Sequence, residues 1–320
     1  MNVVFADDVG VVMDTPELRS RPDAARAPAP DAVARTPPLP EAPGFAHQVV
    51  ETPGLRTHVA TIGDGEPVVL LHGFPQHWWQ WRGVAPRLAA AGYRVICPDL
   101  RGAGWTHADD PGIERETRLH DLLAVLDDLG IERAHVVSHD MGAITATQLA
   151  YTYPERVRRA VQLSMPPMFM SFSVRLIPAF RHLPSLIWHR PGSSLRRVFT
   201  GPYNARPMPA ETIDAHLAPM HRSDIHQAVR ELYRGMVLAE SMRLSRGVYR
   251  RTRLTTPTLF AFGRLDTRFN EPLMRRICSD PERFADRVDL AFVDDAGKLI
   301  PDDAPDAVAN LALDWIRRTD

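Results

Sequence analysis

The fold is decided by the stretch Ala134-His135-Val136-Val137-Ser138-His139-Asp140-Met141-Gly142-Ala143-Ile144-Thr145. It predicts a short apolar strand, a very tight turn and the start of a helix. Asp140 stands at the tip of the turn, between the small residues Ser138 and Gly142. Because a turn this sharp brings the backbones before and after it together, bulky side chains at those two flanks would clash. The pattern therefore predicts that the Asp140 side chain is pushed out above a sheet.

The sequence around this stretch alternates apolar strands with helices. Pro67-Val68-Val69-Leu70-Leu71 is a continuous apolar run, typical of a parallel strand that is buried on both faces. This alternation predicts an α/β fold with a doubly wound, mostly parallel sheet and a site at the carboxyl ends of the strands. An ordinary strand–helix turn with Asp140 as an N-cap is the alternative, and the partners described below argue against it.

Two segments lie outside this alternation. Residues 1–43 are rich in Pro, Ala and Arg, and Pro at this density predicts a poorly ordered arm. Residues 165–255 combine helical patterns with several Pro and clusters of Met, Phe and His, which we interpret as an inserted helical cap. Residues 44–164 and 256–320 are then expected to form the α/β core.

Composition narrows the classes of partner. Proteins that bind nucleic acid or an anionic membrane usually carry excess positive charge, whereas this chain has a net charge of −1. No apolar run approaches the roughly 18 residues of a membrane helix, and the N-terminus lacks the pattern of a secretory signal. We expect the only two cysteines, Cys97 and Cys278, to be reduced in a cytoplasmic protein. A homodimer is left open.

Other features supply chemical partners for Asp140. A carboxylate at such a turn can attack a saturated carbon and form an alkyl ester. His72-Gly73-Phe74-Pro75 follows the first parallel strand, and we expect the backbone N–H groups of Phe74 and Met141 to form an oxyanion hole. Asp266 follows a later strand, at the point where an acid orients a catalytic base.

With these residues the chain resembles the epoxide hydrolase branch of the α/β-hydrolases, over residues ~45–318. The matching stretches are His72–Arg82 (HGFPQHWWQWR), Asp99–Trp105 (DLRGAGW) and His139–Ala143 (HDMGA). The resemblance implies that the turn Asp opens an epoxide, that cap tyrosines donate a proton to the leaving oxygen, and that a His–Asp pair activates water to hydrolyse the ester. It implies a small or medium apolar epoxide as substrate and neither metal nor cofactor.

The resemblance also suggests residues for the substrate site. Tyr233, in Leu232-Tyr233-Arg234-Gly235-Met236, resembles one of the cap tyrosines, and no second one is convincing. His182 is considered for that second place. His72, Trp105 and His182 are the residues that we expect to bind substrate.

The sequence departs from this family at the base. Lys298, in the turn Asp294–Pro305, occupies the position of the catalytic His, and it is the only lysine among 38 basic residues. An ammonium is a poor base because its reference pKa is about 10.4. Burial would lower that pKa, whereas the carboxylates of Asp140 and Asp266 would raise it.

Three interpretations of Lys298 stay open: a working variant that acts as a base or as a charge holding Asp140, a degenerate position, or an altered His.

Two other functions of the protein stay open as well. Haloalkane and haloacid dehalogenases use the same Asp chemistry. Haloalkane dehalogenases usually place Trp directly after the nucleophile, where this chain has Met141. The haloacid enzymes usually add a second Arg after the Arg-Gly loop, and residues 103–107 of this chain contain no Arg. A catalytically degenerate ligand-binding protein is the other alternative.

Overall fold

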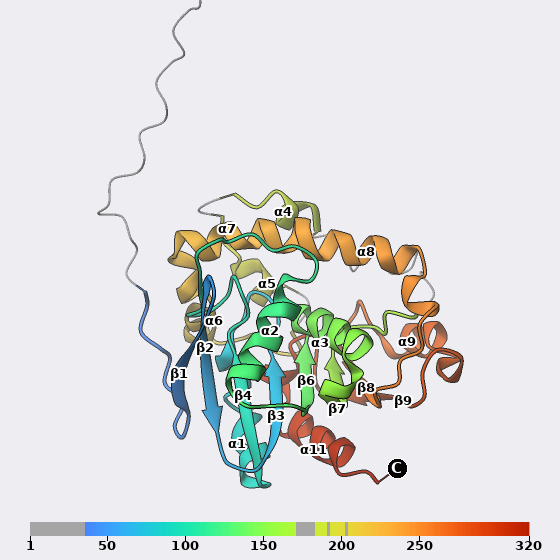
Figure 1. The fold of residues 1–320 in the computed structure, drawn as a ribbon. Coiled ribbons are helices and arrows are strands. Elements are labelled where there is room, and N and C mark those ends of the chain that lie inside the picture. The colour runs from blue at the N-terminus through green and yellow to red at the C-terminus, as the bar shows by residue number, and fades with distance from the viewer. Residues whose placement is uncertain (1–35, 171–182, 191–192, 202–203, 320) are drawn as a thin grey trace, which may run out of the picture. The chain divides into compact units, whose positions relative to one another are not determined.

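The computed structural model describes residues 36–170, 183–190, 193–201 and 204–319. These residues form a nine-stranded sheet (Figure 1). Its strands are β1 (Ala46–Thr52), β2 (Leu55–Ile62), β3 (Glu66–Leu71), β4 (Tyr93–Pro98), β5 (His107–Ala108), β6 (Ala134–His139), β7 (Val157–Leu163), β8 (Thr258–Gly263) and β9 (Val288–Val293).

The strand order is β1-β2-β4-β3-β6-β7-β8-β9, with β5 paired to β2. The pairs that involve β2 are antiparallel, and all pairs from β4 to β9 are parallel. The mostly parallel α/β sheet expected from the sequence is therefore confirmed. Its parallel strands end at one common edge, which is where Asp140 follows β6.

Helices cover both faces of the sheet (Figure 1). They are α1 (Ala85–Ala90), α2 (Thr117–Asp128), α3 (Met141–Thr152), α9 (Glu271–Ile277), α10 (Ile300–Asp303) and α11 (Pro305–Ile316). Helices α1 and α11 pack against Leu70 and Val137, whereas α2 and α3 pack against Val69 and Val136. Because side chains alternate between the two faces of a strand, both faces of β3 and β6 need apolar residues. This is why those strands are continuous apolar runs.

Between β7 and β8 the described chain forms helices that lie over the carboxyl edge of the sheet (Figure 1). They are α4 (Leu183–Ile187), α5 (Arg196–Thr200), α6 (Ala210–Leu217), α7 (Ser223–Glu231), the π-helical turn η6 (Leu232–Val237) and α8 (Leu238–Ser245). Phe74 and Ile144 of the core pack against Val229 and Met236 of this insertion. The domain boundaries at residues 165 and 255 stay a prediction.

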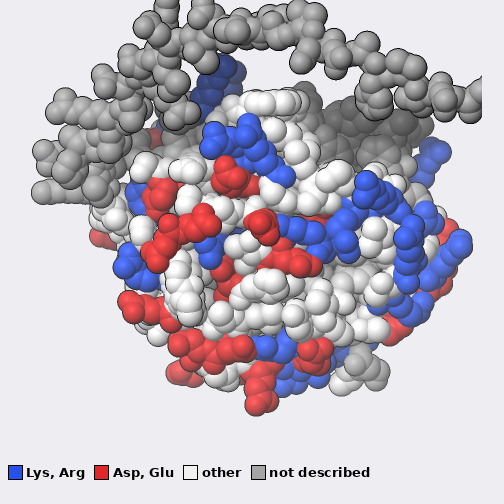
Figure 2. Space-filling model, turned by 45° about the horizontal axis from the view of Figure 1, so that its top comes forward, with Lys and Arg blue, Asp and Glu red and all other residues white. Residues whose placement is uncertain are grey.

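Of the predicted N-terminal arm, residues 1–35 lie outside the described residues. The rest of the arm contacts the core, because the indole N–H of Trp105 donates to the Pro37 carbonyl at 2.7 Å and that of Trp79 donates to the Glu41 carbonyl at 2.9 Å. Helices long and apolar enough to cross a membrane do not occur in the described ranges. Basic and acidic side chains are interspersed over the face shown in Figure 2.

The tight turn after β6 is strained at its tip. Asp140 has φ +50° and ψ −117°, an unusual conformation for a residue with a side chain. A Cβ atom on Gly142 would lie 2.5 Å from the carbonyl oxygens of Leu71 and His72. Glycine is therefore required at position 142, since β3 and the start of α3 approach each other too closely for any side chain.

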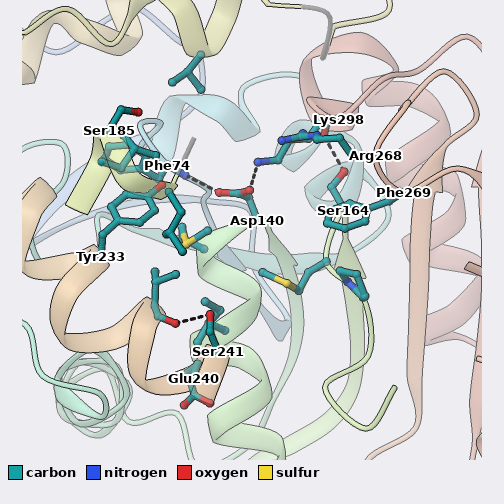
Figure 3. A pocket seen from close by; sticks show the side chains of 18 of the residues that line it. Phe74, Asp140, Ser164, Ser185, Tyr233, Glu240, Ser241, Arg268, Phe269 and Lys298 are labelled. Carbon is teal, nitrogen blue, oxygen red and sulfur yellow. Dashed lines mark hydrogen bonds and ion pairs between the residues drawn. The ribbon is translucent and has the colours of Figure 1, made fainter. Parts of the chain in front are cut away.

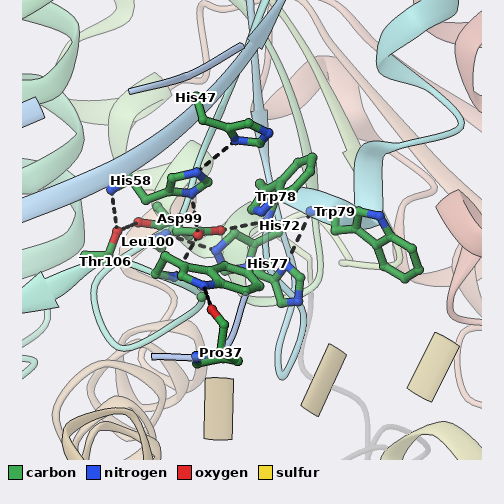
Figure 4. A network of polar contacts seen from close by, with 12 residues as sticks. Pro37, His47, His58, His72, His77, Trp78, Trp79, Asp99, Leu100 and Thr106 are labelled. Atoms are coloured by element: carbon green, nitrogen blue, oxygen red, sulfur yellow. Dashed lines mark hydrogen bonds and ion pairs between the residues drawn. The ribbon is translucent and has the colours of Figure 1, made fainter. Parts of the chain in front are cut away.

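Asp99 anchors the loops beside this turn (Figure 4). Its carboxylate accepts hydrogen bonds from the backbone N–H groups of Trp78 at 2.8 Å and Trp105 at 2.9 Å, and it pairs with His58 Nδ1 at 2.8 Å. Burial raises the pKa of Asp99, but its hydrogen bond and charge interaction with His58 outweigh this and hold the pKa below its usual value. The buried carboxylate is thus compensated, as buried charges must be.

His72 is a structural residue of the same region. Its Nδ1–H donates to the Gly73 carbonyl at 2.8 Å, and its Nε2 accepts the Leu100 N–H at 3.0 Å. Burial lowers the pKa of His72 to about 4, and a proton on Nε2 would face the donating N–H of Leu100. The rings of His72 and Trp105 donate to backbone carbonyls, and neither residue lines the cavity described below. That these two residues bind substrate stays a prediction.

We expect His72 to make the fold acid-sensitive. The unfolded chain binds this proton near pH 6.5 and the folded chain only near pH 4, so acidification favours unfolding. A shift of this size corresponds to roughly 3 kcal/mol of unfolding free energy, present above pH 6.5 and lost by about pH 4. In His72→Gln, the free energy of unfolding measured by denaturant titration should fall less steeply between these pH values. Equal slopes for the two proteins would contradict this assignment.

Candidate active site

A cavity of about 610 Å³ lies between the carboxyl edge of the sheet and the helical insertion. Most of its lining is apolar, including Met141, Ile144, Met165, Met168 and Val237. Polar and charged side chains make up the rest of the lining, and Figure 3 labels several of them, including the carboxylate, the phenol and the cations discussed next. Such a lining is typical of a site for a small apolar ligand.

Asp140 reaches this cavity from the strained turn (Figure 3). One carboxylate oxygen, Oδ1, accepts the backbone N–H of Phe74 at 3.4 Å. The other, Oδ2, forms an ion pair with Nζ of Lys298. The side chains of Asp140 and Lys298 are only 5% and 15% exposed, so their attraction is screened little by water.

The backbone of Lys298 is fixed from the core side. Its carbonyl oxygen accepts hydrogen bonds from His139 Nε2 at 2.9 Å and from Ser164 Oγ at 2.6 Å. The preceding N–H, of Gly297, donates to Asp303 Oδ2 at 2.8 Å. His139 thus lies in the strained turn without lining the cavity, and it orients the residue that faces Asp140.

The pKa values of Asp140 and Lys298 both lie below their usual values, for different reasons. Burial raises the pKa of Asp140, but the positive charges of Lys298, His139 and Arg268 outweigh burial and lower it. Burial lowers the pKa of Lys298; Asp140 opposes this, and the nearby Arg268 cation lowers the pKa further. At neutral pH the carboxyl group of Asp140 is therefore ionised, which is the form that a nucleophile requires.

Asp266 and Arg268 form a second ion pair next to the first. Asp266 Oδ1 accepts the backbone N–H of Arg268 at 2.8 Å and lies 3.6 Å from Arg268 Nε. Its other oxygen, Oδ2, is buried and has no hydrogen-bond partner among the described residues. A buried acceptor without a hydrogen bond lowers the stability of the folded protein. Asp266 is also the residue that the sequence predicts as the acid that orients a catalytic base.

Tyr233 enters the cavity from the π-helical turn η6. Its ring packs edge-on against Phe74, with ring centroids 5.3 Å apart. Burial and the charge of Asp140 raise the pKa of Tyr233 well above its usual value, so the phenol keeps its proton. A Cβ on Gly235 would lie 1.7 Å from the Ile113 carbonyl oxygen, so only glycine lets this part of the insertion approach the core.

The structure brings most of the expected site residues together. The cavity is lined by Asp140, Met141, Phe74, Tyr233 and Lys298. Asp266 is buried behind this lining. His182 lies outside the described residues, so its predicted contact with substrate stays a prediction.

Sequence reasoning missed Arg268. It lines the cavity and its charge acts on both Asp140 and Lys298. A signal was present, since an Asp side chain in a loop commonly binds the backbone N–H two residues later. Asp266-Thr267-Arg268 has this spacing, and the resulting turn places Arg268 beside the acid.

Comparison with known proteins places the chain in a family. A family model described as alpha/beta hydrolase fold matches residues 66–185. An AB hydrolase superfamily protein of Bacillus subtilis is 30% identical over 298 residues, which cover 86% of this chain and 99% of that protein. The solved structure of the epoxide hydrolase CorEH without ligand is 27% identical, has a TM-score of 0.71, and the match covers 85% of this chain and 98% of that one.

Curated epoxide hydrolases match a shorter region. Epoxide hydrolase 3 of Siraitia grosvenorii is 41% identical over 139 residues, which are 42% of this chain and 43% of that protein. The chain thus spans less than half the length of this relative. The matched sheet, the strained turn and the similarity over nearly the whole Bacillus protein agree: the chain belongs to the α/β-hydrolase superfamily, and within it the chain is similar to epoxide hydrolases.

Proposed function

We propose that this protein opens apolar epoxides through a covalent ester on Asp140. The observation that carries the proposal is the Asp140 carboxylate, which the strained turn presents ionised to a mostly apolar cavity. Tyr233 lines the same cavity with a phenol that keeps its proton. The similarity to epoxide hydrolases supports an epoxide as the substrate class.

The first half-reaction uses these two groups. An Asp140 oxygen attacks one ring carbon, the carbon–oxygen bond of the epoxide breaks, and the leaving oxygen takes the proton of Tyr233. The Phe74 N–H, 3.4 Å from Oδ1, holds the second carboxylate oxygen and later faces the ester carbonyl. Lys298 must release Oδ2 for this oxygen to attack, because a lone pair engaged by an ammonium is a weaker nucleophile.

The second half-reaction depends on Lys298 as a base. The first half-reaction lowers the pKa of this residue. Once Asp140 becomes an ester, the negative charge that raises the pKa of Lys298 is gone. Burial and Arg268 then lower the pKa without that opposition. The Lys298 ammonium gives up one proton, which restores the Tyr233 phenol. The neutral amine then takes a proton from water, the resulting hydroxide adds to the ester carbonyl, and the diol alkoxide leaves with that proton from Lys298. The carboxylic acid left on Asp140 gives its own proton to the amine, so the ion pair forms again. Ester formation thus turns the ion-pair partner into the base.

Incubation with styrene oxide should add one hydroxyalkyl group to the intact protein, located on Asp140 by peptide mapping. Hydroxylamine should remove this group, since it cleaves esters but leaves an alkylated amine on Lys298 intact. Asp140→Asn should form no ester. If no adduct, no diol and no halide forms across panels of epoxides and haloalkanes, the catalytic proposal is wrong. Ligand-dependent thermal stabilisation alone would then identify a binding protein, and halide release a dehalogenase.

Replacing the base should separate the two half-reactions. In Lys298→His, ester formation should persist and diol release at pH 7 should rise on the order of 100-fold, because an imidazole is a better base at this pH. The buried Asp266 Oδ2 offers an acceptor for the imidazole N–H. Lys298→Met, the matched control without a base, should form the ester and accumulate it. Single-turnover mass spectrometry distinguishes these outcomes, and a Lys298→Met protein that releases diol as fast as the parent would exclude Lys298 from release.

The rate of ester hydrolysis should also depend on the protonation state of Lys298. Because only the unprotonated amine acts as a base, the decay rate of the isolated ester should rise with pH below the pKa of Lys298 and level off above it. The plateau should move to lower pH in Lys298→His. Quenched-flow measurement of ester decay from pH 6 to 9.5 tests this, and a profile unchanged from that of Lys298→Met would rule out the role of the amine.

A further inference from the structure

We propose that Lys298 is also an imine-forming amine, which condenses reversibly with apolar aldehydes and ketones that enter the cavity. This activity goes beyond the proposed epoxide chemistry and uses a different nucleophile. It rests on the placement of the ε-amino group, on the lining around it and on the proton acceptor beside it.

The placement of the amine is unusual. Lys298 is the only lysine of the chain, and its side chain, 15% exposed, lines the cavity rather than the outer surface. Its carbonyl is held by His139 and Ser164, so the side chain starts from a fixed backbone. A lysine in an apolar pocket, or next to a second cation, is the recognised way to activate an amine as a nucleophile.

Both of these activating conditions are present. The lining contributed by Met141, Ile144 and Val237 is apolar, and Arg268 supplies the second cation. Burial lowers the pKa of Lys298, and Arg268 lowers it further against the opposing charge of Asp140. The unprotonated fraction of this amine at neutral pH is therefore larger than that of a lysine in water.

Asp140 supplies the acid–base partner. It forms an ion pair with Nζ and so can accept the proton that the ammonium must lose before it attacks. The amine nitrogen then bonds to the carbonyl carbon, the carbonyl oxygen takes up two protons and leaves as water, and the nitrogen retains one proton as an iminium. The balance is one ammonium and one carbonyl compound giving one protonated imine and one water, without an oxidant or reductant.

The cavity selects the class of carbonyl compound. Its volume of about 610 Å³ and its apolar lining favour a hydrocarbon chain or ring on the carbonyl carbon. The Tyr233 phenol, which keeps its proton in the same cavity, is a donor for the carbonyl oxygen. Aldehydes and ketones of this type are thus the expected ligands of Lys298.

Reductive trapping tests the proposal. The folded protein is incubated at pH 7 with hexanal and sodium cyanoborohydride, which converts an imine into a stable hexyl amine. Peptide mapping should find the hexyl group on Lys298, formed at least about tenfold faster than on the same lysine in the urea-unfolded chain, because the cavity holds the aldehyde next to the amine. Lys298→Arg keeps a cation beside Asp140 and should not be labelled at this position.

Two results would overturn the proposal. One is a folded protein labelled on its α-amine alone, and the other is labelling of Lys298 no faster than in urea. A melting temperature of Lys298→Arg close to that of the parent shows that lost labelling comes from the amine and not from unfolding. The hexyl group and the epoxide ester lie on different peptides, so this proposal and the proposed function fail separately.

Discussion

The close approach of β3 to the start of α3 is the constraint on which the site depends. Gly142 leaves no room for a Cβ against the carbonyls of Leu71 and His72, and Asp140 takes a positive φ as a result. This strain lifts the carboxylate above the sheet edge, beside the Phe74 N–H that follows β3. Strain of this kind persists only where the surrounding structure over-determines it, and here two buried parallel strands do so.

The second organising feature is a set of four charges at the edge of a mostly apolar cavity. Asp140 pairs with Lys298, and Asp266 pairs with Arg268. Two carboxylates and two cations cancel formally, so the group can be buried without excess charge. The arrangement also couples the groups, because neutralising Asp140 changes the balance that sets the pKa of Lys298. Under the proposed function, Lys298 is therefore the ion-pair partner of Asp140 before the ester forms and a free amine afterwards.

The position of the amine explains why Lys298 is not a simple substitute for a histidine. A lysine side chain is long and carries a compact charge, and in this structure it reaches Asp140 itself. Asp266 Oδ2 is left without a hydrogen-bond partner in the described part of the chain. The acid that would orient an imidazole instead holds the backbone of its own loop and Arg268. The carboxylate at the tip of the turn thus has a lysine and an arginine beside it.

The sequence by itself determined the parallel sheet, the strained turn and the residues at its tip, because these follow from local patterns: apolar runs, small flanking residues and their order along the chain. Tyr233 and Lys298 were predicted as site residues through the resemblance to epoxide hydrolases, and both line the cavity. Only the tertiary structure decided that Lys298 pairs with Asp140 rather than Asp266, that Arg268 joins them, and that the rings of His72 and Trp105 donate to backbone carbonyls. Ion pairing and burial depend on distances between segments far apart in the chain, and no local pattern records those distances.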